Sequence, residues 1–490
     1  MKKTEFTLSF LISNLKTIQI FGSLEKIVSG LSFDSRKVKA GDIFFALKGN
    51  SSDGHFFIPK AIEKGCEIII LEQLPSAINE NVTYILVSDS RDALGELAAK
   101  FYGNPSQKIT LVGVTGTNGK TTLVSLLHGL FQNLGYKTGL LSTVENKIGS
   151  QSYPSELTTP DVITIHRMLS EMVENGCSYA FMEVSSHALD QNRVHGVQFS
   201  GAVFTNITHD HLDYHGNFLN YLYAKKKLFD QLNGNAFALI NGDDKHAKIL
   251  VQNCKVKTYT YSLQSMADFK AKILTNSLEG LHLEIGGKNF TSKLIGDFNA
   301  LNLVAVYATG LLLGQNEIEI LTQLSKLTPP EGRFNHWINP SRNITGIIDY
   351  AHTPDALEKV IHSIQNLKSK KSKLITVIGC GGDRDSAKRP LMGKTATVNS
   401  DWAIFTSDNP RSEDPNSIIE EMGGMLDAIL EKRVIRLADR RAAIQLAVKL
   451  ASQGDIVLVA GKGHEKYQEI KGKKLPFDDK IELENALWAL

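Results

Sequence analysis

The chain has 490 residues, of which 42% are hydrophobic and 22% charged, and its formal net charge is +2. This length is enough for about three domains, and the composition is that of a globular protein, which excludes disordered, collagen-like and coiled-coil classes. The small net charge argues against a protein that coats nucleic acid or an acidic membrane surface. We therefore expect neither a nucleic-acid partner nor a membrane partner.

The cysteines and the N-terminus indicate a cytoplasmic protein. The four cysteines are scattered and form no CxxC pair, so we expect reduced thiols and no disulfide framework. Met1-Lys2-Lys3 is similar to the start of a signal peptide, but Glu5, Ser9 and further polar residues interrupt the apolar segment that would have to follow. No apolar run approaches the roughly 18 residues of a membrane span.

Two boundary signals divide the chain into three parts. Phe101-Tyr-Gly-Asn-Pro105 closes a helical stretch, and Thr328-Pro-Pro-Glu-Gly332 follows an amphipathic helix. Strands alternate with helices in the later parts, which predicts an α/β protein whose central sheet is parallel, like that of P-loop ATPases, and whose C-terminal domain is Rossmann-like. The predicted domains are residues 1–104, 105–330 and 331–490.

Eight strands carry this prediction. Ligands of parallel sheets bind outside the carboxyl ends of the strands, so the chemistry is expected in the loops that follow them. The strands are expected at 109–114, 179–184, 202–207 and 236–241 in the middle domain, and at 344–348, 374–378, 402–406 and 456–459 in the last one.

The first strand of the middle domain leads into Gly116-Thr-Asn-Gly-Lys-Thr-Thr122, and a stripe of leucines marks a helix directly after it. Glycines let backbone N–H groups approach phosphates, and the helix N-terminus adds partial positive charge. Lys120 would reach the β- and γ-phosphates, and the Thr121 hydroxyl would face Mg²⁺. Val114 stands where the strict P-loop pattern requires glycine, which leaves an ordinary glycine-rich turn as the alternative. The strand–loop–helix context favours nucleotide binding.

Acidic and histidine residues follow the next two strands. Glu183 ends one of them, and Asp210 and His211 follow the other. A carboxylate and a neutral imidazole beside the phosphate loop could hold a cation against phosphate oxygens. A structural role is the alternative for each histidine of this segment, His209, His211 and His215, and only the position of His211 favours a ligand role.

Three consecutive lysines, Lys225 to Lys227, lie on the helix predicted after this segment. A solvent-exposed basic face is expected for Lys226 and Lys227. The residue pattern does not separate Lys225 from its neighbours.

Four loops of the last domain, 349–354, 379–385, 407–411 and 461–465, follow predicted strands and would surround one crevice. An arginine can bind a carboxylate with two parallel hydrogen bonds while an acid binds an ammonium group, so a mixture of the two suits an amino acid. Surface ion pairs of little energetic value are the alternative. The cations concerned are Arg384 and Arg411, and the anions are Asp408 and Glu465.

Together these motifs resemble the Mur ligase family, ATP-dependent amide-bond synthetases of peptidoglycan assembly. The resemblance extends over essentially the whole chain, and the short phosphate loop of the family accounts for Val114. Besides the phosphate loop, it rests on Phe33-Asp-Ser-Arg36 with Gly41-Asp42, Glu183-Val-Ser-Ser-His187, Asn206 with Asp210-His211, Gly296-Asp-Phe-Asn-Ala-Leu-Asn302, Asp349-Tyr-Ala-His-Thr-Pro354 and Asp408-Asn-Pro-Arg411.

The resemblance implies a monomeric, cytoplasmic enzyme whose three domains bind a UDP-sugar, ATP and an amino acid in turn. Asp408-Asn-Pro-Arg411 is the form that the family uses for meso-2,6-diaminopimelate. The implied reaction joins this amino acid to UDP-N-acetylmuramoyl-L-alanyl-D-glutamate through an acyl phosphate, with ATP and Mg²⁺ as cofactors. Alternatives are a lysine-adding member, a folylpolyglutamate synthase, against which the Phe33 segment speaks, and a non-catalytic nucleotide-gated binding protein.

Site residues follow from the same resemblance. Lys120, Lys225 and His211 are implied as catalytic, and Thr121, Glu183, His211 and Lys225 (as a carbamate) as metal-binding, although Lys226 stands where relatives often carry an aromatic residue. The implied substrate-binding residues are Ser35, Thr158, Thr159, Ser185, Gln191 and Arg193 for the UDP-muramoyl dipeptide; Gly116, Thr117, Asn118, Gly119, Lys120, Thr121, Thr122, Asn299, Arg333, Asp349 and His352 for ATP; and Arg384, Asp408, Asn409, Pro410, Arg411, Gly461 and Glu465 for diaminopimelate.

Overall fold

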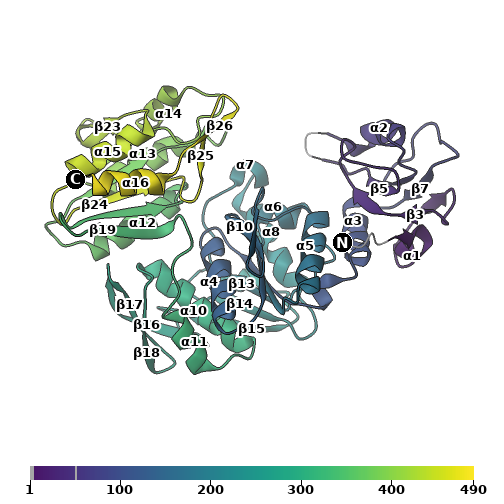
Figure 1. Ribbon diagram of the computed structural model, residues 1–490, viewed down its shortest axis with the longest axis horizontal. Coiled ribbons are helices and arrows are strands. Elements are labelled where there is room, and N and C mark those ends of the chain that lie inside the picture. The colour runs from purple at the N-terminus through teal and green to yellow at the C-terminus, as the bar shows by residue number, and fades with distance from the viewer. Residues whose placement is uncertain (1–4, 50–51, 490) are drawn as a thin grey trace.

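The computed structural model describes residues 5–49 and 52–489, so the Met1-Lys2-Lys3 segment lies outside the described residues. Three large sheets follow one another along the chain, each with its own helices, and the N-terminal and C-terminal parts lie at opposite ends of the long axis (Figure 1). The fold is therefore a three-domain α/β architecture, as predicted. Within the described residues, no helix combines the length and the apolar character that crossing a membrane requires.

The N-terminal sheet has five strands in the order β2-β7-β6-β5-β4, and only β2 is antiparallel to its neighbour. Helices α1 and α3 cover one face and α2 covers the other, which is why the central strands are apolar on both sides. A small ribbon joins β1 (Phe6–Thr7) to β3 (Ile27–Val28). The remaining elements are α1 (Leu8–Ile12), β2 (Gln19–Phe21), β4 (Gly30–Ser32), β5 (Asp42–Phe45), α2 (Ile58–Glu63), β6 (Ile68–Leu71), β7 (Thr83–Leu86) and α3 (Ser90–Phe101).

The middle sheet has eleven strands in the order β11-β10-β9-β12-β8-β13-β14-β15-β16-β17-β18. The six strand pairs from β9 to β16 are parallel, and antiparallel hairpins extend both edges. The four predicted strands are confirmed as β8 (Thr110–Thr115), β12 (Tyr179–Glu183), β13 (Gly201–Phe204) and β14 (Phe237–Asn241). The others are β9 (Thr138–Leu141), β10 (Glu145–Ile148), β11 (Gln151–Pro154), β15 (Lys257–Ser262), β16 (Phe269–Ser277), β17 (Gly280–Ile285) and β18 (Lys288–Ser292).

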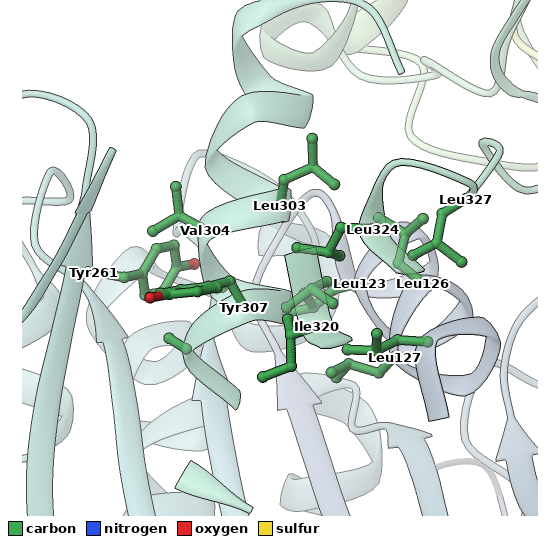
Figure 2. Packing of buried hydrophobic residues seen from close by; sticks show 14 of the residues in the cluster. Leu123, Leu126, Leu127, Tyr261, Leu303, Val304, Tyr307, Ile320, Leu324 and Leu327 are labelled. Carbon is green, nitrogen blue, oxygen red and sulfur yellow. The ribbon is translucent and has the colours of Figure 1, made fainter. Parts of the chain in front are cut away.

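Helices cover both faces of this sheet. On one face the leucine stripe of α4, including Leu123 and Leu127, packs against Leu303 and Val304 of α10 and Ile320 of α11 (Figure 2). Burying each such side chain stabilises the fold by about 1.5–3 kcal/mol, so the helix after the phosphate loop is firmly anchored. On the other face lie α5, α6 and α8. The helices are α4 (Lys120–Asn133), α5 (Val162–Glu174), α6 (Ser186–Asp190), α7 (Leu212–His215), α8 (Phe218–Asp230), α9 (Ala247–Leu250), α10 (Asp297–Leu312) and α11 (Glu317–Leu324).

The C-terminal sheet has the order β19-β20-β24-β21-β22-β23, parallel except for the β19–β20 pair. Helices α12 to α14 cover one face and α15 and α16 the other, so the Rossmann-like prediction is confirmed. The elements are β19 (Arg333–Asn339), β20 (Ile344–Asp349), α12 (Pro354–Leu367), β21 (Leu374–Ile378), α13 (Lys388–Asn399), β22 (Trp402–Phe405), α14 (Pro415–Met422), β23 (Val434–Arg436), α15 (Arg440–Leu450), β24 (Ile456–Ala460), β25 (Tyr467–Ile470), β26 (Lys473–Pro476) and α16 (Asp479–Trp488).

Candidate functional site

The phosphate loop between β8 and α4 requires its glycines. Gly116 has φ +153°, and a Cβ there would lie 1.9 Å from the Thr205 hydroxyl oxygen. Gly119 has φ +86°, and a Cβ there would lie 3.1 Å from a side-chain oxygen of Asn302. Val114 is a buried residue of β8 inside the sheet, which explains why the loop forms although the strict motif fails. The backbone of the loop therefore lies close to neighbouring segments at both glycines.

Polar contacts connect this loop to the C-terminal domain. The Lys120 ammonium group donates to the carbonyl oxygens of Gly116 and Thr117, at 2.9 and 2.8 Å, and burial lowers its pKa. The Arg333 guanidinium, from β19, donates to the Thr121 hydroxyl at 3.0 Å. Two domains thus meet at the start of α4.

A cavity of about 590 Å³ lies where the middle and C-terminal domains face each other. It is lined by the carboxyl-end loops of both sheets, as expected for parallel strands. The predicted site residues on its walls are Thr117, Asn118, Gly119, Lys120, Thr121, Thr122, Thr158, Glu183, His211, Arg333, Asp349, His352, Arg384, Asp408, Asn409, Arg411, Gly461 and Glu465.

Two acids and a histidine lie beside the phosphate loop. The buried Glu183 carboxylate accepts hydrogen bonds from the backbone and the hydroxyl of Thr143, at 2.7 and 3.2 Å. Desolvation lowers the pKa of His211 to about 4 despite the Asp210 carboxylate 3.4 Å away, so its imidazole is neutral at pH 7. Burial alone would raise the pKa of Asp210, but His211 and neighbouring cations hold it below its usual value. Among the described residues, no three His, Cys, Asp or Glu side chains form a group able to hold a metal ion alone.

The three lysines of α8 differ sharply in environment. The Lys225 ammonium nitrogen is buried, donates to the Gly116 carbonyl at 2.9 Å and lies 4.6 Å from the centre of the Tyr221 ring. Burial, together with the nearby Lys120, lowers its pKa well below the usual value. The predicted exposure is confirmed for Lys227 but wrong for Lys226, because its aliphatic stem packs inward and its ammonium group pairs with Asp230 one turn along the helix.

Four residues predicted for the UDP-muramoyl dipeptide form one hydrogen-bonded network. The Thr159 hydroxyl donates to the Glu183 carbonyl at 2.9 Å and accepts from the Ser185 backbone at 3.0 Å. The Arg193 guanidinium donates to the Thr159 carbonyl at 2.9 Å and to the Gln191 side-chain oxygen at 2.9 and 2.6 Å. This network begins at the end of β12, and its four residues are absent from the cavity lining.

A few predicted residues lie apart from the cavity wall. Ser35 belongs to the N-terminal domain, in the loop after β4, and its predicted role stays a prediction. Asn299 lies one layer behind the wall, where it donates to the Ile295 carbonyl at 2.9 Å and accepts from Asn302 at 3.2 Å. Asn302 itself lines the cavity, and sequence reasoning had quoted it only as part of a motif. Gly116, Lys225 and Pro410 are also absent from the lining.

The loops predicted to bind the amino acid bring charged side chains to the cavity. Arg411 has φ +51°, and its guanidinium donates to the Gly382 carbonyl at 2.6 Å. The Asp349 carboxylate accepts from the backbone N–H groups of Phe334 and Ala351, at 2.8 and 2.7 Å. Burial raises the pKa of Asp349 to about 6, although Arg333 and these hydrogen bonds oppose the shift.

Sequence reasoning missed several residues of the site. Tyr350 and Lys388 line the cavity, and Lys388 donates to the His352 carbonyl at 3.1 Å. Lys462 is fully buried behind the wall, between two glycines of a loop that the sequence did single out. The flanking glycines at the end of a predicted strand were the available signal for Lys462, whereas nothing in the pattern distinguished Lys388 from neighbouring basic residues.

Comparison with known families matches all three parts of the chain. Residues 114–310 match the Mur ligase middle domain, residues 332–463 match the Mur ligase glutamate ligase domain, and residues 27–102 match the catalytic domain of the Mur ligase family.

Individual proteins extend this similarity over nearly the full length. UDP-N-acetylmuramoyl-L-alanyl-D-glutamate--2,6-diaminopimelate ligase of Cytophaga hutchinsonii is 51% identical over 478 residues, which are 97% of this chain and 98% of that protein. The ligase of the same name from Bacteroides fragilis is 50% identical over 470 residues, 96% and 97% of the two chains. A solved structure of a ligase of that name superimposes with a TM-score of 0.71 at 33% identity and covers 99% of both chains.

Proposed function

The chain belongs to the Mur ligase family, and from this premise we propose that it joins meso-2,6-diaminopimelate to UDP-N-acetylmuramoyl-L-alanyl-D-glutamate at the expense of ATP. It is then a peptide synthase of peptidoglycan precursor assembly, a process on which cell shape and cell division depend. The observation that carries the proposal is one cavity in which a phosphate loop faces the arginines and acids of an amino-acid site. Relatives about 50% identical over the full chain carry this activity in their names.

In the proposed division of labour, each domain binds one substrate. Residues 1–104 bind the UDP-sugar, residues 105–330 bind ATP, and residues 331–490 bind the amino acid. The substrates are small molecules, and the enzyme works as a monomer in the cytoplasm, where ATP is available. This assignment is supported by the position of the phosphate loop in the middle domain and of Arg384 and Arg411 in the C-terminal one.

The first step is phosphoryl transfer. The γ-carboxylate of the D-glutamyl residue attacks the γ-phosphorus of ATP, the bond to the bridging oxygen breaks, and an acyl phosphate and ADP form. The Lys120 ammonium group and the N-terminus of α4 offset the negative charge that develops on the phosphoryl oxygens. Arg333, which contacts Thr121, adds a second cation from the C-terminal domain.

The residues beside the loop fit Mg²⁺. This ion prefers oxygen ligands and usually takes one or two carboxylates while the substrate phosphates and water complete its shell. Thr121, Glu183 and the neutral His211 would hold it, and Glu183 is a buried carboxylate at the cavity wall. When bound, Mg²⁺ supplies charge neutralisation at the phosphates.

Lys225 is proposed to act as a carbamate. Carbamate formation needs a neutral amine, and the lowered pKa of the buried Lys225 supplies one. The product is an anion beside the Gly116 carbonyl and the phosphate loop, able to support a second Mg²⁺.

The second step forms the amide bond. The amine of diaminopimelate attacks the acyl carbon, and phosphate leaves from the tetrahedral intermediate. Arg411 binds the distal carboxylate of the amino acid, the group that lysine lacks. A hydrogen bond to a charged group contributes about 1.5–3 kcal/mol, so its loss selects against lysine.

ADP release from the purified protein tests the proposal. We expect release only when ATP, the UDP-dipeptide and diaminopimelate are all present, with turnover on lysine at least about 10-fold lower. Equal turnover on lysine would favour a lysine-adding ligase. ATP binding without any release dependent on an amino acid would favour a nucleotide-gated binding protein.

A further inference from the structure

Lys462 is a fully buried lysine that contacts three of the residues proposed to bind the amino acid. Its ammonium nitrogen lies 3.3 Å from the Asp408 carboxylate, 3.0 Å from the Asn409 side-chain oxygen and 3.0 Å from the Glu465 carboxylate. The lysine follows β24, whereas Asp408 and Asn409 follow β22. One buried cation therefore connects two of the loops whose acids and arginines line the cavity at the proposed amino-acid site, here called the amino-acid wall.

These contacts determine how Asn409 is oriented. Its side-chain oxygen accepts from Lys462 and from the Glu469 backbone N–H at 2.9 Å, so its amide nitrogen turns to the Glu465 carboxylate at 2.7 Å. Asp408, Asn409 and Glu465 line the cavity, but Lys462 does not. Lys462 can therefore influence the site through these three residues, although it does not line the cavity itself.

Charge balance gives the lysine a second effect. Asp408 and Glu465 contribute −2 and Lys462 contributes +1, which leaves this cluster at −1. The neighbouring Arg440 is paired with Asp479 and adds nothing to the sum. A net charge of −1 matches a single ammonium group, whereas two carboxylates without Lys462 would repel each other.

We propose that Lys462 is a positioning residue that holds Asp408, Asn409 and Glu465 in the arrangement and charge state that bind an ammonium group of the incoming amino acid. The proposal rests on the proposed function, because it concerns the amino-acid site of that reaction. Lys462 makes no contact with the substrate itself. Its effect is expected on the affinity for the amino acid and not on the affinity for ATP or the UDP-dipeptide.

Steady-state kinetics of Lys462→Met test this role, because methionine keeps most of the length of the side chain and removes its charge. We expect the KM for diaminopimelate to rise roughly 10- to 150-fold, with the KM values for ATP and the UDP-dipeptide within about 3-fold of the wild type. The control is Lys466→Met in the same segment, whose half-exposed lysine pairs with Glu331 and Asp478 outside the cavity. This control should leave all three KM values unchanged.

A second variant covers the case in which Lys462→Met does not fold. The double variant Lys462→Met/Glu465→Gln restores the −1 charge, so it should fold. Because Lys462 also contacts Asp408 and Asn409, the KM of this variant for diaminopimelate should be about 3- to 10-fold above that of Glu465→Gln alone, with the other two KM values unchanged. A KM for diaminopimelate equal to that of Glu465→Gln alone would overturn the proposal.

The remaining outcomes separate the two hypotheses. An unchanged KM for diaminopimelate in a folded Lys462→Met enzyme, or an equal rise of all three KM values, would overturn the positioning role alone. A wild-type enzyme that releases no ADP with diaminopimelate would overturn the proposed function itself.

Discussion

The buried environment of Lys225 favours the neutral amine that the proposed carbamate requires. A lysine excluded from water loses the hydration that favours its charged form, so its pKa falls and the neutral amine becomes available. Because protonation blocks the reaction with CO2, the proposed carbamate should form more readily as the pH rises through that lowered pKa.

We predict that activity falls in buffer freed of CO2 and returns on addition of bicarbonate. Lys225→Ala should lower kcat/KM by about 100-fold, the upper end of the cost of losing a group that supports a metal, and should abolish the response to bicarbonate. The matched control is Lys226→Ala, which removes the adjacent buried lysine and should keep that response. A Lys225→Ala enzyme that still responds to bicarbonate contradicts the carbamate.

Protonation of Asp349 is expected to cause the fall of kcat/KM at acid pH. Its carboxylate receives two backbone hydrogen bonds and lies near Arg333, and burial raises its pKa to about 6. As the pH falls through this value the carboxylate is protonated and loses its charge, so kcat/KM should decrease below pH 6. Asp349→Asn should lack this decrease and be less active at neutral pH. An unchanged acid limb in the variant would show that another group causes it.

A buried ion pair in the C-terminal domain joins the starts of two helices, α15 and α16. Arg440 at the start of α15 and Asp479 at the start of α16 are fully buried and joined by two hydrogen bonds of 2.7 Å. Arg440 also donates to the Ala460 carbonyl at the end of β24, at 2.9 Å. The pair therefore supports the loop that carries Gly461 and Glu465.

Removal of Asp479 should destabilise the C-terminal domain strongly. Asp479→Ala leaves a buried, unpaired guanidinium, and we expect the free energy of unfolding to fall by about 3–5 kcal/mol. The control is the pair of exposed Arg441 and largely covered Glu482. Glu482→Ala leaves only an exposed guanidinium unpaired and should cost less than about 1 kcal/mol. Urea denaturation followed by circular dichroism measures both, and equal losses would contradict this account.

Strands marked by a short, continuous run of apolar residues could be predicted from the sequence. The eight predicted strands are confirmed within three residues at each end, because continuous apolar runs bounded by glycines are typical of strands buried on both faces. The hairpins at the edges of the middle sheet were missed, since β11 is exposed along its whole length and lacks an apolar signal. Lys226 was misjudged for a related reason: three adjacent lysines look alike until packing separates them.

Site residues that lie within one loop could be predicted from the sequence. Residues whose position depends on contact between two distant segments could not. The phosphate loop and the acids and arginines of the amino-acid wall lie in loops that follow predicted strands, and Glu183 is the last residue of β12. The placement of Asn302 in front of Asn299 depends on which face of α10 meets the cavity. The burial of Lys462 depends on two loops that are more than fifty positions apart in the sequence and become neighbours only in the folded sheet.

For the whole molecule, the decisive feature is the contact between the middle and C-terminal domains. The Asp355 carboxylate on α12 accepts hydrogen bonds from the Asn118 side chain in the phosphate loop and from the Thr208 hydroxyl after β13, both at 2.9 Å. In the proposed reaction both domains present their substrates to one reacting carbon, and we infer that this contact helps to align them.

Asp355→Ala should lower kcat by about 10- to 100-fold through misalignment of the two domains, with little change in thermal stability. The exposed Glu358 on the same helix supplies the control, and Glu358→Ala should behave like the wild type. Small-angle X-ray scattering with all substrates bound should show a more open average shape for Asp355→Ala. Identical scattering and full activity would exclude a role of Asp355 in domain alignment.

We propose that diaminopimelate, and not lysine, is joined to the UDP-linked dipeptide in the cavity between these domains. Its most direct test is a competition in which the enzyme receives ATP, the UDP-dipeptide and equal concentrations of both amino acids, with the product identified by mass spectrometry. We expect a UDP-tripeptide carrying diaminopimelate in at least about 10-fold excess, and loss of this preference in Arg411→Ala. A product carrying mainly lysine, or equal amounts of both, would contradict it.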